Sequence, residues 1–250
     1  MSSPILAAAQ FQSLRGELEH NLNRHMLFME DAADLGAQYL LFPELSLTGY
    51  EPDITHELAL PSTDTRLEPL RAKAMQLRLA TTVGVPLKGP ANTVQIGALT
   101  FTAEGEVIAY AKQYLHPGES EVFSPGKSDC FLTLGARQIG LCVCADFSHP
   151  EHAQRAADGG AWVYAASVLI SPTGYEHDVT LLQGHARRHA LPVLMANHAG
   201  PTGGWQSVGR SGLWDESGNL VAGMPGAGEG LLVVSFTDQG WEGRVVMRES

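Results

Sequence analysis

The sequence predicts one domain of the α/β class. Three observations support this prediction. Amphipathic helical segments and apolar segments of strand length alternate along most of the chain. No internal repeat, low-complexity tract or linker interrupts it. The length of 250 residues, with 44% hydrophobic and 17% charged residues, is ample for one large core. We therefore expect residues 1–250 to fold as a single domain.

Four helices are predicted from apolar residues that recur every three or four positions. The first is the clearest, because its apolar face runs from Leu14 through Leu22 and Met29 to Ala33, and Gly36 marks its end. The predicted helices cover about 14–36, 67–77, 150–158 and 181–189.

Strands are predicted where short apolar runs lie between glycine, proline and polar residues. Pro43 ends the second run, because proline cannot donate to the ladder in the middle of a sheet. The last quarter of the chain is predicted to be β only, with a turn at 215–218. The predicted strands cover 5–11, 39–42, 79–85, 92–100, 107–111, 130–134, 138–143, a segment from 162, 192–196, 207–214, 219–222 and 231–236.

Charge and cysteine content argue against several classes of protein. Sixteen basic and 27 acidic residues give a net charge of −11, so a nucleic acid or an anionic membrane would be repelled. The longest apolar runs fall short of the roughly 20 residues that cross a bilayer. Three cysteines and an N-terminus without the basic and apolar regions of a signal peptide favour a reducing cytoplasm.

Three polar residues stand at the ends of predicted strands, where α/β folds collect their active sites. They are Glu44 in LLFPELSLTGYEP, Lys112 in VIAYAKQYLHPGE and Cys144 in IGLCVCADFSHPE. A thiol attacks only as its thiolate. A nearby lysine ammonium lowers the thiol pKa, and a carboxylate can take and return protons. These three side chains therefore suffice for acyl transfer through a covalent intermediate.

Simpler or competing explanations exist for these residues. Lys112 alone would be interpreted as a solvated charge at a strand edge, and Cys142 as a small buried residue. The side chains that could form a metal site are Cys142, Cys144, His149 and His152. Their spacing is not that of common zinc ligands, and a cysteine protease that uses His149 as its base would lack a family signature around the cysteine.

Taken together, the three segments resemble the motifs of the nitrilase superfamily, the carbon–nitrogen hydrolases with a Glu, Lys and Cys triad. The order and separation of the three residues agree with that family, and family-like pieces follow at 155–161, 186–188, Asn197 and 209–215. The resemblance covers nearly the whole chain. It implies a four-layer α-β-β-α sandwich and the association of copies of the chain into a homodimer or a higher homo-oligomer.

The resemblance also implies a role for each residue. Cys144 would be the nucleophile and Glu44 the general base, and Lys112 with the backbone N–H of Ala145 would stabilise the oxyanion. No metal or organic cofactor would take part.

A second glutamate is implied six residues before the proline of an F-x-P-G segment. Here that position is Glu119, because Phe123, Pro125 and Gly126 follow it in GESEVFSPG. Glu121 is the nearby alternative.

The residues around Cys144 favour an amide as substrate. Asp146 stands where amidases and carbamoyl hydrolases carry an acid, whereas nitrilases tend to have Trp-Glu. Phe147 and Ser148 offer no cation for a substrate carboxylate. The residues considered as an alternative source of positive charge are Arg187, Arg188 and Arg210. We expect Tyr50, Phe147 and Ser148 to line the substrate pocket. An N-carbamoyl amidohydrolase, a nitrilase, an acyltransferase and an inactive binding protein stay open as alternatives.

Overall fold

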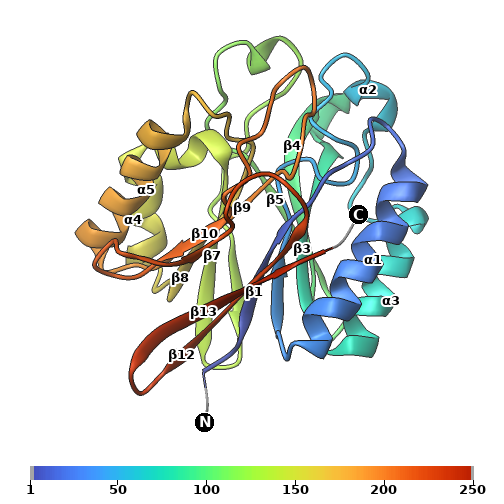
Figure 1. Cartoon of the computed structure of the whole chain (residues 1–250). Coiled ribbons are helices and arrows are strands. Elements are labelled where there is room, and N and C mark those ends of the chain that lie inside the picture. The colour runs from blue at the N-terminus through green and yellow to red at the C-terminus, as the bar shows by residue number, and fades with distance from the viewer. Residues whose placement is uncertain (1–2, 249–250) are drawn as a thin grey trace.

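The computed structural model describes residues 3–248, and two β-sheets form its centre (Figure 1). The strands of the larger sheet are β1 (Leu6–Gln10), β2 (Tyr39–Leu41), β3 (Ala80–Lys88), β4 (Val94–Phe101), β5 (Val107–Ala111), β12 (Gly230–Thr237) and β13 (Gly240–Met247). The strands of the smaller sheet are β6 (Phe131–Leu134), β7 (Arg137–Val143), β8 (Val163–Val168), β9 (Val193–Asn197), β10 (Gly212–Trp214) and β11 (Leu220–Gly223).

Each sheet has a parallel centre and antiparallel margins. The spatial orders are β13-β12-β1-β2-β3-β4-β5 and β11-β10-β9-β8-β7-β6. β1 to β3 are parallel to one another in the first sheet, and so are β7 to β9 in the second. The carboxyl ends of neighbouring parallel strands therefore lie at one edge of each sheet, where side chains from different strands can meet.

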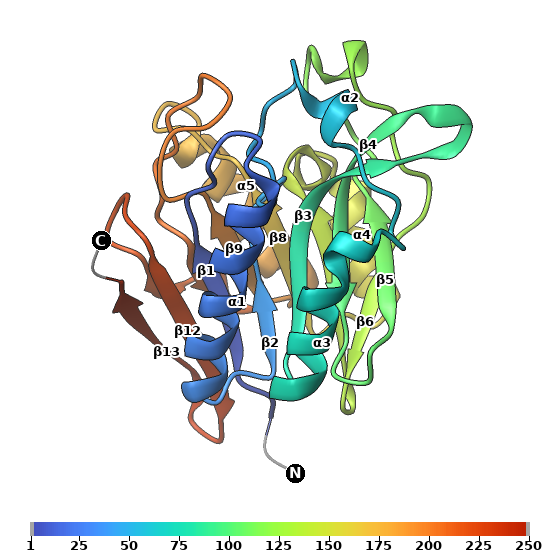
Figure 2. The same cartoon turned by 90° about the vertical axis from the view of Figure 1, so that its right-hand side faces the viewer.

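Helices cover the outer faces of both sheets. They are α1 (Leu18–Asp34), α3 (Glu68–Leu77), α4 (Pro150–Asp158) and α5 (Tyr175–His189), whereas the short α2 (Thr55–Leu58) lies beyond the end of the larger sheet (Figures 1 and 2). Figures 1 and 2 show α1 and α3 against the larger sheet and α4 and α5 against the smaller one. The predicted four-layer α-β-β-α sandwich is confirmed. No helix within residues 3–248 is long and apolar enough to cross a membrane.

Three separate apolar clusters fill the spaces between the four layers. The first lies between the sheets and contains Ala8 and Leu141. The second packs Ala7 of β1 against α1 and α3, and the third packs Cys142 of β7 against α4 and α5. Successive residues of a strand point to opposite faces, so β1 and β7 each supply side chains to two clusters. Burial of apolar surface on both faces thus holds each sheet in place.

Two of the predicted helices begin elsewhere. The first starts at Leu18 rather than Leu14, because Gly16 adopts a φ of +69° that ends the preceding segment in a turn. α5 starts at Tyr175 rather than 181, because Val179 extends the buried face formed by Leu182 and Ala186 by one turn.

The strand prediction fails mainly at the C-terminal end. The strand expected over 207–214 covers only Gly212–Trp214. β13, which was not predicted, is the edge strand of the larger sheet, and most of its residues are exposed or half-buried. A strand that buries neither face fully lacks the apolar alternation from which strands are predicted.

Candidate active site

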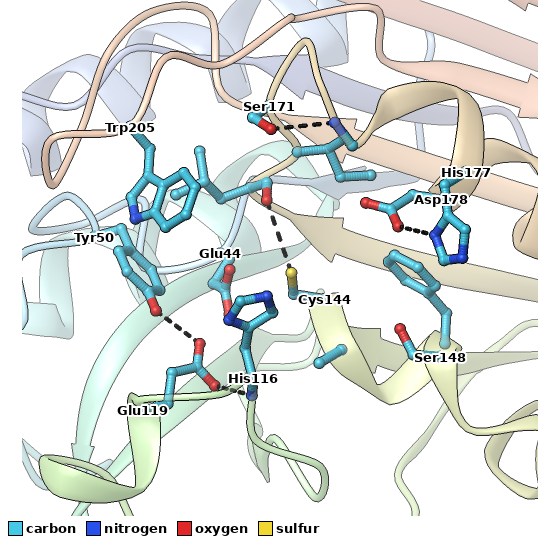
Figure 3. Close-up of a pocket in the computed structure, with 15 residues that line it drawn as sticks. Glu44, Tyr50, His116, Glu119, Cys144, Ser148, Ser171, His177, Asp178 and Trp205 are labelled. Carbon is cyan, nitrogen blue, oxygen red and sulfur yellow. Dashed lines mark hydrogen bonds and ion pairs between the residues drawn. The ribbon is translucent and has the colours of Figure 1, made fainter.

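Glu44, Lys112 and Cys144 meet at the end of the sandwich where strands of both sheets terminate. Glu44 follows β2, Lys112 directly follows β5, and Cys144 directly follows β7. Figure 3 shows Cys144 beside Glu44 and Glu119. Glu44 and Lys112 therefore follow strands of the larger sheet, Cys144 follows a strand of the smaller sheet, and Glu119 lies in the connection between the two sheets.

Lys112 is fully buried and binds two carboxylates. Its Nζ donates to Glu44 Oε1 at 2.9 Å and to Glu119 Oε1 at 2.7 Å. Burial alone would lower the pKa of Lys112, but the negative charges around it outweigh that effect and hold the pKa above its usual range. A solvated strand-edge lysine is therefore ruled out, and Lys112 is a permanent cation inside the site.

Glu119 occupies the position that the F-x-P-G spacing predicts. It begins a short 3₁₀ turn and is buried, whereas Glu121 is exposed. Besides Lys112, its Oε1 accepts from Tyr50 Oη at 2.8 Å, and its Oε2 accepts from the backbone N–H of His116 at 2.7 Å. Both carboxylate oxygens are thus fixed by donors, so Glu119 is held rigidly against Lys112.

Glu44 differs from Glu119 in having one oxygen without a partner. Its Oε2 is buried and accepts no hydrogen bond from any residue within 3–248. Burial raises the pKa of Glu44 to about 7, although Lys112 opposes this rise. A carboxyl group with this pKa and a vacant oxygen can exchange a proton near neutral pH.

The backbone turns sharply at Cys144. This residue has a φ of +42° and begins the 3₁₀ helix Cys144–Ser148. By strand alternation, Cys142 and Cys144 would point to the same face of the sheet. Cys142 does pack in the cluster under α4 and α5, but Cys144 contacts the cluster between the two sheets. The left-handed backbone conformation therefore separates the two thiols, at a cost of about 1–3 kcal/mol.

The expected lowering of the Cys144 pKa by Lys112 is present, but other effects outweigh it. Burial and the negative charge of Glu44 raise the pKa of this thiol above its usual range, and Lys112 offsets them only in part. Burial likewise raises the pKa of Cys130 and Cys142. Thiolate formation at Cys144 therefore depends on a neighbouring base, and Glu44 is the group placed to act as one.

Glu44 and Cys144 line a pocket of about 320 Å³, whereas Lys112 is fully buried and does not line it. Tyr50, Phe147 and Ser148 all line it, as does Ala145. The remaining lining residues are Glu44, His116, Glu119, Cys144, Leu169, Ile170, Ser171, Gly174, His177, Asp178 and Trp205. The side chains considered as a source of positive charge, Arg187, Arg188 and Arg210, are not among them.

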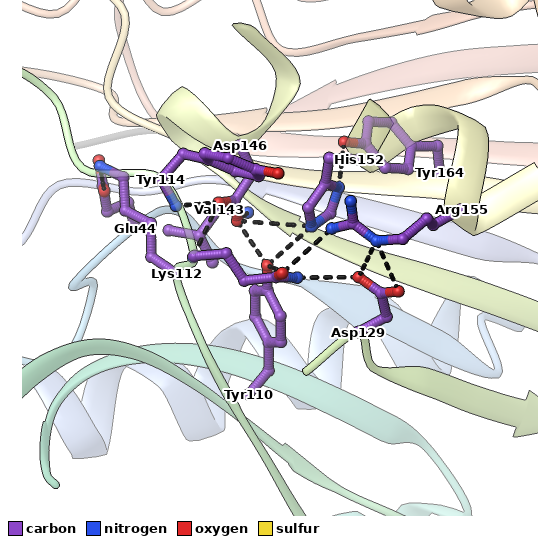
Figure 4. A network of polar contacts seen from close by, with 11 residues as sticks. Glu44, Tyr110, Lys112, Tyr114, Asp129, Val143, Asp146, His152, Arg155 and Tyr164 are labelled. Carbon is purple, nitrogen blue, oxygen red and sulfur yellow. Dashed lines mark hydrogen bonds and ion pairs between the residues drawn. The ribbon is translucent and has the colours of Figure 1, made fainter. Parts of the chain in front are cut away.

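Asp146 anchors the site from behind and does not line the pocket. Its Oδ1 accepts from the backbone N–H groups of Gln113 and Tyr114, each at 2.9 Å. Its Oδ2 accepts from Val143 N at 3.0 Å and from Tyr110 Oη at 2.6 Å (Figure 4). One buried carboxylate thus fixes the segment after Lys112 relative to the turn at Cys144.

The network continues behind Asp146 into the helical layer. Tyr110 and Tyr164 each lie within hydrogen-bond distance of one ring nitrogen of His152, at 2.9 and 2.7 Å. Burial lowers the pKa of His152, so the ring is neutral at physiological pH. Both nitrogens are engaged with tyrosines. Within residues 3–248, no group of three or more histidine, cysteine, aspartate or glutamate side chains could hold a metal ion.

Three residues that support the site, Leu169, Asn197 and His198, carried little signal in the sequence. The carbonyl oxygen of Leu169 lies 3.8 Å from Cys144 Sγ. The amide of Asn197 holds the next residue, because its Oδ1 accepts from Ile170 N at 3.0 Å and its Nδ2 donates to Ile170 O. His198 lies within hydrogen-bond distance of the backbone oxygen of Glu44, at 2.7 Å. Only Asn197 stood out beforehand, as part of a family-like piece.

Comparison of the sequence with known protein families identifies the family to which the chain belongs. The family model described as carbon-nitrogen hydrolase matches residues 5–242. The chain belongs to the carbon-nitrogen hydrolase family. The resemblance to the nitrilase superfamily that the three motifs carry is thereby confirmed.

The chain is similar to several individual enzymes of known activity. The amidase from Nesterenkonia sp. AN1 has a TM-score of 0.85 and 30% identity, over 95% of this chain and 92% of that one. An (R)-stereoselective amidase from Pseudomonas sp. is 29% identical over 74% of this chain and 67% of its own length. A glutamine-dependent NAD(+) synthetase from Rhodobacter capsulatus is 26% identical over 92% of this chain. The match spans only 43% of that longer relative.

Proposed function

We propose that this protein hydrolyses the C–N bond of a small linear amide through a thioester on Cys144. The observation that supports this most strongly is that Glu44 and Cys144 line one pocket and that Glu44 binds the buried Lys112. The related Nesterenkonia amidase lends further support. One of its mutants carries the acetamide moiety of fluoroacetamide at the active site cysteine, and another is in complex with butyramide.

In the proposed first half-reaction, Glu44 accepts the thiol proton and Cys144 Sγ attacks the carbonyl carbon. Lys112 Nζ and the backbone N–H of Ala145 donate to the oxyanion. The N–H of Ala145 is available for this, because a residue in the first turn of a helix has no intrahelical acceptor. Such donors typically contribute about 3 kcal/mol each. The C–N bond then breaks, and Glu44 returns its proton to the leaving nitrogen.

In the proposed second half-reaction, water attacks the thioester and gives a proton to Glu44. The C–S bond breaks, the carboxylic acid leaves, and the proton on Glu44 returns to the sulfur. Glu119 keeps Lys112 in place throughout. These steps use only groups of this chain and water, so the proposal includes no cofactor.

An activity screen over small amides, N-carbamoyl amines and nitriles tests the proposal. We expect ammonia release from amides, none from a Cys144→Ala control, and an acyl adduct on Cys144 by mass spectrometry. Preference for a carbamoyl amine or a nitrile would select one of those alternatives. Faster transfer to an added amine than to water would indicate an acyltransferase. Failure of every reactive ester and amide to acylate Cys144 would contradict the proposal.

We also propose a homodimer in a reducing, cytoplasmic environment. The three cysteines are free thiols, which supports a compartment where thiols stay reduced. The proposed homodimer is supported by the family resemblance.

A further inference from the structure

One wall of the pocket carries a carboxylate that the proposed reaction does not use. Asp178 lies in the first turn of α5 and lines the pocket. Figure 3 shows Cys144 between Glu44 and Glu119 on one side and Asp178 on the other. Asp178 is therefore separated from the Lys112 cluster and faces the pocket from the opposite wall.

The charge of Asp178 is not balanced by a cation. Within residues 3–248, no lysine or arginine forms an ion pair with it, and its one charged or chargeable neighbour is the exposed His177, whose Nδ1 lies 3.1 Å from Asp178 Oδ1. Lys112 is already shared between Glu44 and Glu119. A ligand in the pocket would therefore meet an uncompensated carboxylate at this wall.

The stabilising effect of an acid at a helix N-terminus does not account for this placement. Glu176 lies in the same first turn of α5 and also interacts favourably with the helix dipole. Its side chain is 89% exposed and does not line the pocket, whereas the side chain of Asp178 is 25% exposed and does. The two acids thus share a helix position but not an environment.

The proposed chemistry fixes which part of a substrate lies near Asp178. Glu44 must reach the leaving nitrogen to return its proton, so the leaving group lies on the Glu44 side of Cys144. The acyl chain must then extend toward the other side, where Asp178 lies.

We propose that Asp178 is a specificity-determining residue that selects primary amides whose acyl chain carries an ammonium group. The inference rests on the proposed amide hydrolysis and adds a substrate class to it. Phe147 also lines the pocket, and aromatic faces attract cations. The net charge of −11 favours the approach of a cation over that of an anion.

Matched substrate pairs test the proposal. Each pair consists of an ω-amino amide and the alkyl amide in which a methyl group replaces the ammonium: β-alaninamide with butyramide, γ-aminobutyramide with valeramide, and δ-aminovaleramide with hexanamide. At the best chain length, we expect kcat/KM to favour the cationic member at least about tenfold. Asp178→Asn should reduce that ratio below about threefold, because kcat/KM for the cationic member falls more than kcat/KM for the alkyl amide.

Glu176→Gln is the matched control, because it removes one negative charge from the same helix turn outside the pocket. It should keep the wild-type ratio. Equal kcat/KM for both members of every pair, or an unchanged ratio in Asp178→Asn, would overturn the role of Asp178. Hydrolysis of butyramide in the same experiment would still support the proposed amide hydrolysis.

A binding measurement separates the two proposals further. Calorimetry on the Cys144→Ala protein should show tighter binding of the ω-amino amide than of its alkyl partner, and the difference should vanish when Asp178→Asn is added. Selective binding without turnover in the wild type would support the pocket assignment and contradict amide hydrolysis. Absence of any selective binding would contradict the role of Asp178.

Discussion

At the scale of single residues, the three cysteines differ more in their neighbours than in their acidity. Burial raises the pKa of all three thiols. Cys144 alone lies beside Glu44, and it faces the space between the sheets because its φ is positive. Sequence position could not separate Cys142 from Cys144 by alternation, since a regular strand would have aimed both thiols the same way.

Serine substitutions at these two cysteines should therefore have different effects. Cys144→Ser should abolish turnover with little change in stability, because an alkoxide is far harder to form than a thiolate. Cys142→Ser should retain activity but lose about 1–3 kcal/mol of unfolding free energy, because it places a hydroxyl in an apolar cluster. Ammonia assays and urea denaturation measure the two effects. Full activity of Cys144→Ser would refute its assignment as nucleophile.

The pH dependence of the rate should report Glu44. Its carboxylate form must be present to accept the thiol proton, and burial raises its pKa to about 7. We expect kcat/KM to rise with pH through about 7 and to fall about tenfold per pH unit below it. Glu44→Gln should reduce activity by roughly 10²–10⁴-fold and abolish this step. A flat profile between pH 5 and 8 in the wild type would contradict the role of Glu44.

Stability should depend on pH in the opposite direction. The pKa of Glu44 is higher in the folded than in the unfolded chain, so the folded state binds more protons between about pH 4.5 and 7. Relative to Glu44→Gln, the wild type should lose unfolding free energy as pH rises through this window. The loss should be a few kcal/mol at most, since one pKa unit corresponds to about 1.4 kcal/mol. Denaturation of both proteins at pH 5 and pH 8 gives the comparison, and a constant difference would contradict it.

At the scale of elements, the loop that carries Glu44 rests directly on β3. Gly84 N donates to Ser46 Oγ at 3.1 Å, and Gly84 O accepts from Leu47 N at 2.9 Å. A Cβ at Gly84 would lie 2.1 Å from Leu45 N and 2.5 Å from Pro43 O. Only a glycine allows this approach of two backbones, so residue 84 helps to set the position of Glu44.

Two glycine-to-alanine substitutions should therefore have opposite effects. Gly84→Ala should lose about 1–3 kcal/mol of unfolding free energy and most of the activity, because the loop must move away from β3. Gly184→Ala is the matched control, since it lies within α5 with no atom within 4 Å of the added Cβ. It should gain about 0.5–1 kcal/mol and keep full activity. Denaturation and ammonia assays on both variants decide the matter, and a fully active Gly84→Ala protein would contradict the proposed role of Gly84.

The elements that could be predicted from sequence are those that bury an apolar face. α4 and β7 bury such faces, and they lie close to their predicted bounds. β13 was not predicted, because none of its residues is fully buried and its sequence lacks an apolar face. Within the site, Glu44, Lys112, Cys144 and Glu119 were found from motifs and spacing. Asp178 and the backbone turn at Cys144 could not be found in this way. Asp178 is distinguished by its place in the wall of the pocket and Cys144 by its positive φ angle, and neither property is visible in the sequence.

At the scale of the whole molecule, we expect the chain to form a homodimer. We expect solution scattering or light scattering at working concentration to give twice the 26.8 kDa of the chain. β13 leaves one edge of the larger sheet unpaired within the described residues, and Val246 and Met247 on it are 37% and 45% exposed. An open edge with apolar side chains is a surface that a second chain can cover. A particle of the monomer mass would contradict the homodimer.

The division of the site between the two sheets has a consequence for folding. Glu44 and Lys112 belong to one half of the sandwich and the Cys144 thiol to the other, so neither half holds a complete reaction centre. The first apolar cluster is what brings them face to face. The chain therefore becomes catalytically competent only when the two halves dock. The rate at which activity returns during refolding consequently measures the rate of that docking step.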